Sequence, residues 1–527
     1  MRAELFRGIA PRRRMPDHNA ALRPVLAWHG ARRHAAALAL HAACILSGLA
    51  AALPANAAPG MLTEGSAGGS ALPGPVTVTR LGAPELDRIG LYPAQRAGLD
   101  AGLWGATSRD VLVRLIAHDH SESLPALRDL FTEMLLAELD PPREDGEGTR
   151  LFLARVDALL MLGDLAGAQA LIDAAQRDDP EFSMRRFDIA LLSGTEDLAC
   201  QRMRERPGAG AGYAARVFCL ARSGEWDTAA LTLESAEALD LVSGAELDLL
   251  HRFLEIEHED APPSPPKPRH PTPLEFTMFE AIGEPYRTAG LPLIYAHADL
   301  RPIIGWKARL EAAERLARAG AISPERLWDI YGERSPAASG GLWDRVGAVQ
   351  KLEAALREAD ADAVGQALPT AWRAMQAAGL ELPLARQHGA ALARLPLEGA
   401  AARIALEAGL LSGARTRIAG QAIPQDRQDA FLIALARGVP QSAEPQSLQA
   451  RAIAEGFETA APPPRLAGLL REGRSGEALL LALDLLDEGE AGNYEALRDG
   501  IALLLQMGLR TVAIETGLQL LLLERRG

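Results

Sequence analysis

Apolar residues recur at three- and four-residue spacing along most of the chain, in pairs of segments separated by a glycine. This spacing places the apolar side chains on one face of an α-helix. Glycine suits the break because it adopts the left-handed conformation that ends a helix at little cost. The pattern therefore predicts helical hairpins, most clearly over residues 153–175, 213–239 and 465–489, with a weaker copy over 402–420.

Strand-forming segments, which are rich in β-branched and aromatic residues, are nearly absent from the sequence. Residues 75–81 (PVTVTRL) are the one short candidate. Alanine and leucine, both strong helix formers, are abundant throughout. The sequence therefore predicts an all-α fold.

The second helix of three hairpins carries an alanine that would let its two helices approach closely: Ala168, Ala229 and Ala478. This arrangement resembles the tetratricopeptide-type hairpin and, more broadly, an α-solenoid. The tryptophan-led start and the terminal proline of that repeat are missing, and the copies are irregularly spaced. The resemblance therefore implies a TPR-like solenoid of helical hairpins.

A proline-rich segment, Glu259–Pro273 (EDAPPSPPKPRHPTP), interrupts the helical pattern. Proline removes a helix hydrogen bond and favours stiff extended backbone. We therefore expect a linker over residues 259–273. It would join an N-terminal helical lobe, residues 81–258, to a C-terminal helical lobe, residues 274–527.

The N-terminus has the order of a secretory signal peptide over residues 1–57. Arg32 and Arg33 precede an apolar stretch, and Ala55-Asn56-Ala57 forms a small-residue cleavage pattern. Met15 is an alternative translation start, because the signal is long when it is counted from Met1. The competing interpretation is a single membrane anchor, which the cleavage pattern and the small residues disfavour. Residues 58–80, rich in Gly, Ser, Ala and Pro, would be a flexible tether.

After cleavage we expect a periplasmic or secreted protein that does not span the membrane. The apolar segment 501–523 carries Arg510 and Glu515 near its middle, which is costly for a spanning helix. The formal net charge of −14 argues against a nucleic-acid partner, because phosphate binding needs clustered Lys and Arg.

Together, the alanine-rich helices, the signal and the proline-rich break resemble uncharacterised secreted helical-repeat proteins of alphaproteobacteria. Some of these carry the label antifreeze glycopeptide polyprotein. The label implies no chemistry here, because the long Ala-Ala-Thr tracts of antifreeze glycopeptides are absent.

Cys200 and Cys219 are two of only three cysteines. Each lies seven positions from the segment PGAGAG (residues 207–212), which is expected to reverse the chain between two helices. Equal distances from the turn would bring the two thiols face to face, and an oxidising compartment would join them in a disulfide. A metal site lacks two further ligands, and a redox pair lacks the C-x-x-C spacing. Two buried free thiols remain the alternative.

Candidate catalytic or metal-binding chemistry is sparse. His118, Asp119 and His120 are adjacent, so they would point in different directions on a helix, and a solvated helix end is the preferred interpretation. His251, Glu255 and His258 share one helical face but lack the H-E-x-x-H order. No nucleophile, phosphate-loop or dinucleotide motif is present. We therefore expect no catalytic, cofactor-binding or metal-binding residue.

Tryptophans are the remaining candidates for binding. Trp104 lies in a predicted loop, where it would be either a packing plug or an anchor for a partner. Five others are expected to pack between hairpins in the core: Trp226, Trp306, Trp328, Trp343 and Trp372.

A helical-repeat architecture without a catalytic constellation favours a non-enzymatic scaffold or adaptor in the periplasm. Its partner would be a protein or another component of the cell envelope. The alternative is a peptidoglycan-acting envelope enzyme with a solenoid domain. Such an enzyme also needs a catalytic domain with a glutamate in a recognisable setting, and no such domain follows Pro273.

Overall fold

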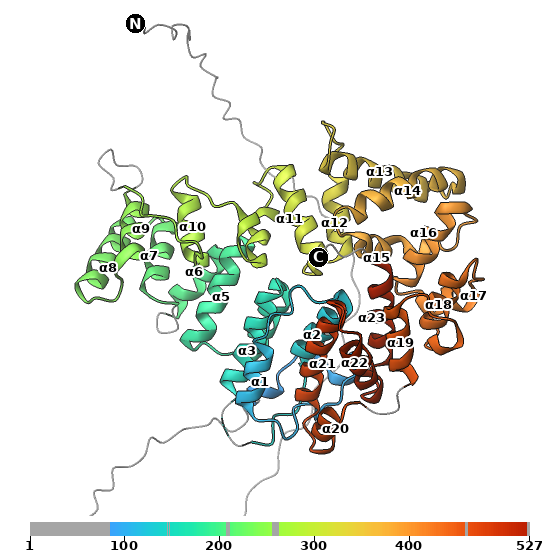
Figure 1. The fold of residues 1–527 in the computed structure, drawn as a ribbon. Coiled ribbons are helices and arrows are strands. Elements are labelled where there is room, and N and C mark those ends of the chain that lie inside the picture. Colours follow the sequence, from blue (N-terminus) through green and yellow to red (C-terminus); the bar gives the residue numbers. More distant parts are fainter. Residues whose placement is uncertain are drawn as a thin grey trace, which may run out of the picture. The chain divides into compact units, whose positions relative to one another are not determined.

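Figure 1 shows the computed structural model, which describes residues 85–144, 146, 148–206, 211–255, 263–458 and 462–523. The predicted signal peptide, tether and short strand lie outside these ranges, as does the predicted chain reversal at residues 207–210. By their internal contacts, residues Thr79–Gly527 form one compact unit.

Helices make up nearly all the regular structure of the described residues, so the predicted all-α fold is confirmed. The α-helices in the first part of the unit are α1 (Arg109–Ile116), α2 (Pro125–Leu136), α3 (Thr149–Met161), α4 (Leu165–Ala175), α5 (Pro180–Ser193), α6 (Glu196–Glu205), α7 (Tyr213–Arg222), α8 (Trp226–Ala238), α9 (Gly244–Leu254), α10 (Pro273–Ala281) and α11 (Trp306–Ala319). Those that follow are α12 (Pro324–Gly332), α13 (Leu342–Glu358), α14 (Ala361–Gln376), α15 (Glu381–Leu392), α16 (Gly399–Leu410), α17 (Arg415–Gln421), α18 (Arg427–Ala436), α19 (Leu448–Glu458), α20 (Pro464–Arg471), α21 (Ser475–Glu490), α22 (Tyr494–Gln506) and α23 (Arg510–Leu522).

Short elements complete the described fold. The 3₁₀-helices are η1 (Leu86–Arg88), η2 (Ala94–Ala97), η4 (Thr288–Gly290), η5 (Leu293–Leu300) and η6 (Pro440–Ser442). Two two-residue strands, β1 (Tyr92–Pro93) and β2 (Ala137–Glu138), pair in parallel. No helix of the described residues has both the length and the apolar character needed to cross a bilayer.

The predicted hairpins are present as the pairs α3–α4, α7–α8, α16–α17 and α20–α21. In three of them the turn glycine has the expected left-handed backbone: Gly163, Gly224 and Gly473. Ala168, Ala229 and Ala478 are fully buried, as their expected role between closely packed helices requires. The local pattern of the sequence therefore predicted these hairpins correctly.

The buried apolar residues form two large cores that meet at α5. The main core draws on residues 86–192 and 276–522. A second core draws on residues 187–253 and 274–282, from α5 to α10. Helix α10 follows the proline-rich segment, but it packs against both α5 and α9. The two cores therefore do not correspond to the expected lobes 81–258 and 274–527.

The described part of the proline-rich segment, from Pro263, is held against α10 and the chain that follows it. Tyr286 donates a hydrogen bond to the carbonyl of Pro268, and the Lys267 ammonium lies 5.3 Å from the centre of the Tyr286 ring. Tyr295 donates to the carbonyl of Pro271. Residues 263–273 of the expected linker (259–273) therefore pack against the folded unit in an extended conformation.

The first and last helices of the unit pack together, which the sequence did not predict. Helix α1 packs against α21, and α2 packs against α23 (Figure 1). The backbone N–H of Ala106 donates to the carbonyl of Gly473, and that of Gly476 donates to Leu103. Gly105 has φ +48°, and a Cβ there would lie 1.9 Å from the Gly473 carbonyl oxygen. This close backbone approach requires glycine.

One half-buried carboxyl group makes the stability of the unit depend on pH. Burial in α5 raises the pKa of Asp188 to about 7, although Arg185 opposes the shift. Because the folded state binds this proton more tightly than the unfolded chain does, stability falls as the pH rises from about 4 to about 7. We expect Asp188→Asn to raise the free energy of unfolding at pH 8 by roughly 2 kcal/mol and to have little effect at pH 4. Urea denaturation at the two pH values measures this difference. An equal effect at both would contradict it.

Candidate functional site

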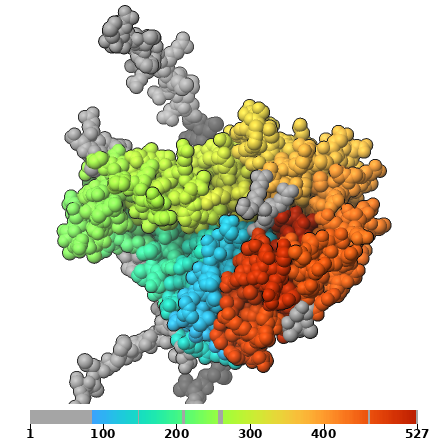
Figure 2. Space-filling model, viewed as in Figure 1, coloured from blue at the N-terminus to red at the C-terminus, as the bar shows by residue number. Residues whose placement is uncertain are grey.

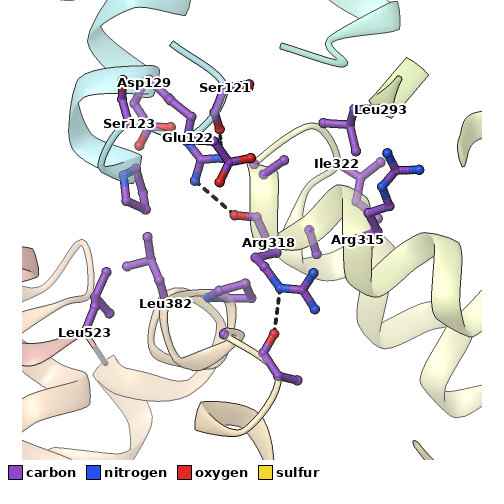
Figure 3. Close-up of a pocket in the computed structure, with 18 of the residues that line it drawn as sticks. Ser121, Glu122, Ser123, Asp129, Leu293, Arg315, Arg318, Ile322, Leu382 and Leu523 are labelled. Carbon is purple, nitrogen blue, oxygen red and sulfur yellow. Dashed lines mark hydrogen bonds between the residues drawn. The ribbon is translucent and has the colours of Figure 1, made fainter. Parts of the chain in front are cut away.

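A wide cleft among the described residues lies where helices from the start, middle and end of the unit meet. It has a volume of about 890 Å³. Its lining comes from the α1–α2 loop and the start of α2, the start of η5, the α11–α12 turn, the α14–α15 turn and the end of α23 (Figure 3). Ligand pockets of proteins fall between about 300 and 1,000 Å³, so the volume is sufficient for a substantial ligand.

Arginines hold the walls of the cleft together through backbone carbonyls. Arg128 donates to the carbonyl of Arg318 over 3.0 Å, and Arg318 donates to the carbonyl of Ala378 over 2.6 Å (Figure 3). Arg315 donates to the carbonyls of Thr288 and Leu291. The walls formed by α2, by the end of α11 and by the α14–α15 turn are thus tied to one another.

Charges of both signs face the cleft. Burial lowers the pKa of Arg315, and the neighbouring cation of Arg318 lowers it further. Opposite these two arginines lie carboxylates of the α1–α2 region, among them Glu122 and Asp129 (Figure 3). Asp129 forms an ion pair with Arg386 of α15. The four arginines and four carboxylates of the lining balance, so the cleft offers both donors and acceptors without a strong net field.

Apolar side chains supply the rest of the lining. Leu293 and Ile322 lie on one side, and Leu382 and Leu523 lie on another (Figure 3). Leu382 is buried, and Leu293, Ile322 and Leu523 are half-buried. A ligand that fills this cleft therefore meets apolar surface and polar groups together.

Serine, histidine and aspartate meet next to the cleft, but not in a catalytic arrangement. Ser123 Oγ donates to Asp487 Oδ2 over 2.7 Å, and His120 Nδ1 lies 3.4 Å from both atoms. In a hydrolytic triad, histidine stands between the other two and takes the serine proton on one ring nitrogen. Here Nδ1 faces both partners and the serine donates directly to the carboxylate, so His120 does not stand between Ser123 and Asp487 as a triad requires.

The histidine cluster instead joins the two ends of the unit. His120 is buried and stacks edge-on against Phe131, with the ring centres 4.8 Å apart. His118 is half-exposed, with its Nδ1 3.4 Å from Asp484 Oδ1 on α21. The preferred interpretation as a solvated helix end is therefore wrong for His120, because the packing of α1 and α2 on the C-terminal helices covers it.

The other candidate ligands do not gather into a site. Among the described residues, no three His, Cys, Asp or Glu side chains are placed to hold one metal ion. His251 contacts Glu237 of α8, with 3.4 Å between Nε2 and Oε2. The third member of that predicted face, His258, lies outside the described residues.

Trp104 is fully buried, which is incompatible with the role of partner anchor. Its ring lies against α21, where a Cβ on Gly476 would come within 2.8 Å of Trp104 Cε3. The packing-plug interpretation is therefore confirmed, and the contact secures the N-terminal loop to the α20–α21 hairpin. Trp226, expected in the core, is 47% exposed.

The predicted pairing of Cys200 and Cys219 is confirmed: they form a disulfide whose Cα atoms are 5.2 Å apart. Cys200 lies in α6 and Cys219 in α7, both in the second core. The bond therefore joins neighbouring helices of the α5–α10 region, away from the cleft.

Sequence reasoning missed the cleft itself, because its lining comes from segments up to 404 positions apart, from Asp119 to Leu523. Arg315 and Arg318 stand three positions apart on α11, so the sequence indicates that they share one face of the helix. It does not indicate which other helices lie opposite that face. A comparison with models of protein families, with curated proteins and with solved structures finds no match.

Proposed function

We propose that the protein is an exported, non-enzymatic scaffold, built as a TPR-like array of helical hairpins, that holds a segment of a partner protein in the cleft. The observation that carries this proposal is the lining of the cleft. A polypeptide segment presents backbone donors and acceptors together with apolar side chains. The balanced charges and the apolar residues of the cleft complement such a ligand.

Export is supported by the signal-like N-terminus and by the cysteine pair. Disulfides persist in oxidising compartments and are rare in the cytosol of most organisms. The array of hairpins supports a binding role, because stacked helical repeats present extended surfaces and are widely used to bind other proteins. The packing of α1 and α2 on α21 and α23 adds rigidity, so the cleft would be held open before a partner arrives.

Peptidoglycan zymography separates this proposal from the envelope-enzyme alternative. The purified exported protein is run in a gel that contains peptidoglycan and is then renatured. We expect no clearing, because Ser123, His120 and Asp487 are not arranged as a hydrolytic triad. A cleared band at the position of the intact protein would overturn the non-enzymatic proposal.

A charge reversal in the cleft should release the partner. Arg318 is exposed and lines the cleft, so we expect Arg318→Glu to weaken partner binding by about tenfold or more. The measurement is the migration of the protein on a native gel of envelope extract, where the wild-type protein should run as a complex larger than the chain alone. Arg334→Glu is the matched control, because Arg334 is also exposed but lies outside the cleft. Identical migration of both variants and the wild type would contradict the proposal.

A further inference from the structure

Helix α8 and the loop after it expose an unusual amount of apolar surface. Trp226, Leu231, Leu239 and Leu241 are 47%, 63%, 66% and 47% exposed, and all four lie within sixteen residues of sequence. Trp226 is partly supported from beneath by Phe253 of α9, with the ring centres 6.3 Å apart. Trp226 and Leu231 stand five positions apart and therefore point to different sides of α8. We name the surface that carries these four side chains, on α8 and the loop after it, the α8 face.

Only one side of α8 is buried. Ala229, Leu233 and Ala236 face the second core, and the helices that pack against α8 are α7 and α9. Figure 1 shows α8 at the outer end of this region, away from α21 and α23. The solvent side of an outer helix in a hairpin array is normally polar. The α8 face instead exposes large apolar side chains.

Within residues 223–250, which include α8 and the loop after it, every charged side chain is acidic. The segment from Ser223 to Leu250 contains seven acidic residues and neither lysine nor arginine. Glu225 lies 4.0 Å from Arg204, and Glu237 lies 3.4 Å from His251. Asp227, Glu234 and Asp240 are exposed and form no ion pair with another described residue. Exposed leucines are therefore bordered by carboxylates that are not neutralised by their neighbours.

We propose that the α8 face is a docking surface for a basic amphipathic segment of a partner protein. Leu231, Leu239 and Leu241 would bury the apolar side of that segment, while its lysines or arginines would pair with Asp227, Glu234 and Asp240. A second copy of this chain is a poor occupant, because a two-fold contact would place these carboxylates against themselves. An anionic membrane surface is repelled for the same reason.

This surface is separate from the cleft. The cleft is lined by residues of α2, α3, η5, α11, α12, α14 and α15, by the loops next to them and by Leu523, and none of its lining belongs to α8. The protein would thus hold two chains at once, which is the property of an adaptor. The inference does not rest on the proposed role of the cleft.

The test uses the full exported protein with its disulfide intact. The probe is an 18-residue helical peptide of leucine and lysine with its leucines at i, i+3, i+4 and i+7. A second peptide has glutamate in place of every lysine. Fluorescence anisotropy at low and high salt gives the dissociation constants. We expect the lysine peptide to bind at least about tenfold more tightly than the glutamate peptide, and its binding to weaken with salt.

Two variants locate the binding site. We expect Leu231→Ser with Leu239→Ser, and separately Asp227→Asn with Glu234→Gln, to weaken binding of the lysine peptide by about tenfold each. The matched control is Ile303→Ser with Ile423→Ser, which removes two leucine-sized side chains that are 81% and 77% exposed elsewhere. The control and Arg318→Glu should leave binding unchanged, which separates this surface from the cleft.

Several results would overturn the inference. One is tight binding of both peptides, and another is an equal loss of binding in the control variant. A third is unchanged binding in both α8 variants. Self-association of the wild-type protein that disappears in Leu231→Ser with Leu239→Ser would instead assign the face to a second copy of the chain.

Discussion

Replacing Arg155 with methionine should lower the free energy of unfolding by about 3–5 kcal/mol. Arg155 is fully buried in α3, and burial lowers its pKa to about 10. Its guanidinium donates to the carbonyls of Leu135, Asp87 and Ala137 over 2.9, 3.2 and 3.0 Å. Methionine fills a similar space but leaves three buried carbonyls without these donors. Urea denaturation of the purified protein measures the loss.

Arg155→Lys is the matched control for this prediction. Lysine keeps the positive charge, but its single ammonium cannot span three carbonyls as the planar guanidinium does. We expect a smaller loss than for methionine. Equal stability of Arg155→Met and the wild type would show that these hydrogen bonds do not hold η1 and the α2–β2 junction to α3.

Replacing both Cys200 and Cys219 with alanine should cost about 3 kcal/mol of stability. The disulfide closes a loop between residues 19 positions apart, so its loss increases the conformational entropy of the unfolded chain. Both side chains are buried in the second core, so the loss of their sulfur contacts adds to the effect. Urea denaturation followed by circular dichroism measures the loss of stability.

A reductant provides the control. Dithiothreitol should bring the wild-type protein close to the stability of the double-alanine variant and should leave that variant unchanged. A thiol count on denatured, unreduced protein that begins after the predicted signal peptide gives an independent check. Two free thiols per chain would contradict the disulfide.

Local structure could be predicted from the sequence because its causes are local. The period of apolar residues and the glycines at the turns specify α3–α4, α7–α8 and α20–α21. The cysteine pair was predicted in the same way, because equal distance from one turn relates two neighbouring helices. Each of these inferences depends on residues fewer than 30 positions apart.

The contacts that create the cleft have no local signature. Asp487 meets Ser123 across 364 positions of sequence, and Arg386 meets Asp129 across 257. For Trp104, the sequence indicated only a large aromatic side chain in a loop. Its burial depends on contact with α21, which is distant in the sequence. The prolines of residues 263–273 indicated extended backbone correctly, but extended backbone can be a packed strap as well as a spacer between lobes.

Exposure on α8 was also beyond sequence reasoning. Trp226 begins a helix whose alanines and leucines fit a buried position as well as an outer one. Whether these side chains are buried depends on how many helices pack against α8. The helices that pack closely against it are α7 and α9. The acidic run from Ser223 to Leu250 was the available signal, because a segment with seven acids and no lysine or arginine is seldom fully packed.

Photo-cross-linking from inside the cleft tests the scaffold account most directly. Benzoylphenylalanine replaces Ile322, a half-buried residue of the cleft, in the full chain expressed in cells that export it. The matched control replaces Ile423, which is 77% exposed and lies outside the cleft. The account predicts a discrete protein adduct of higher mass from position 322 and none from position 423. No adduct from position 322, or the same adducts from both positions, would contradict it.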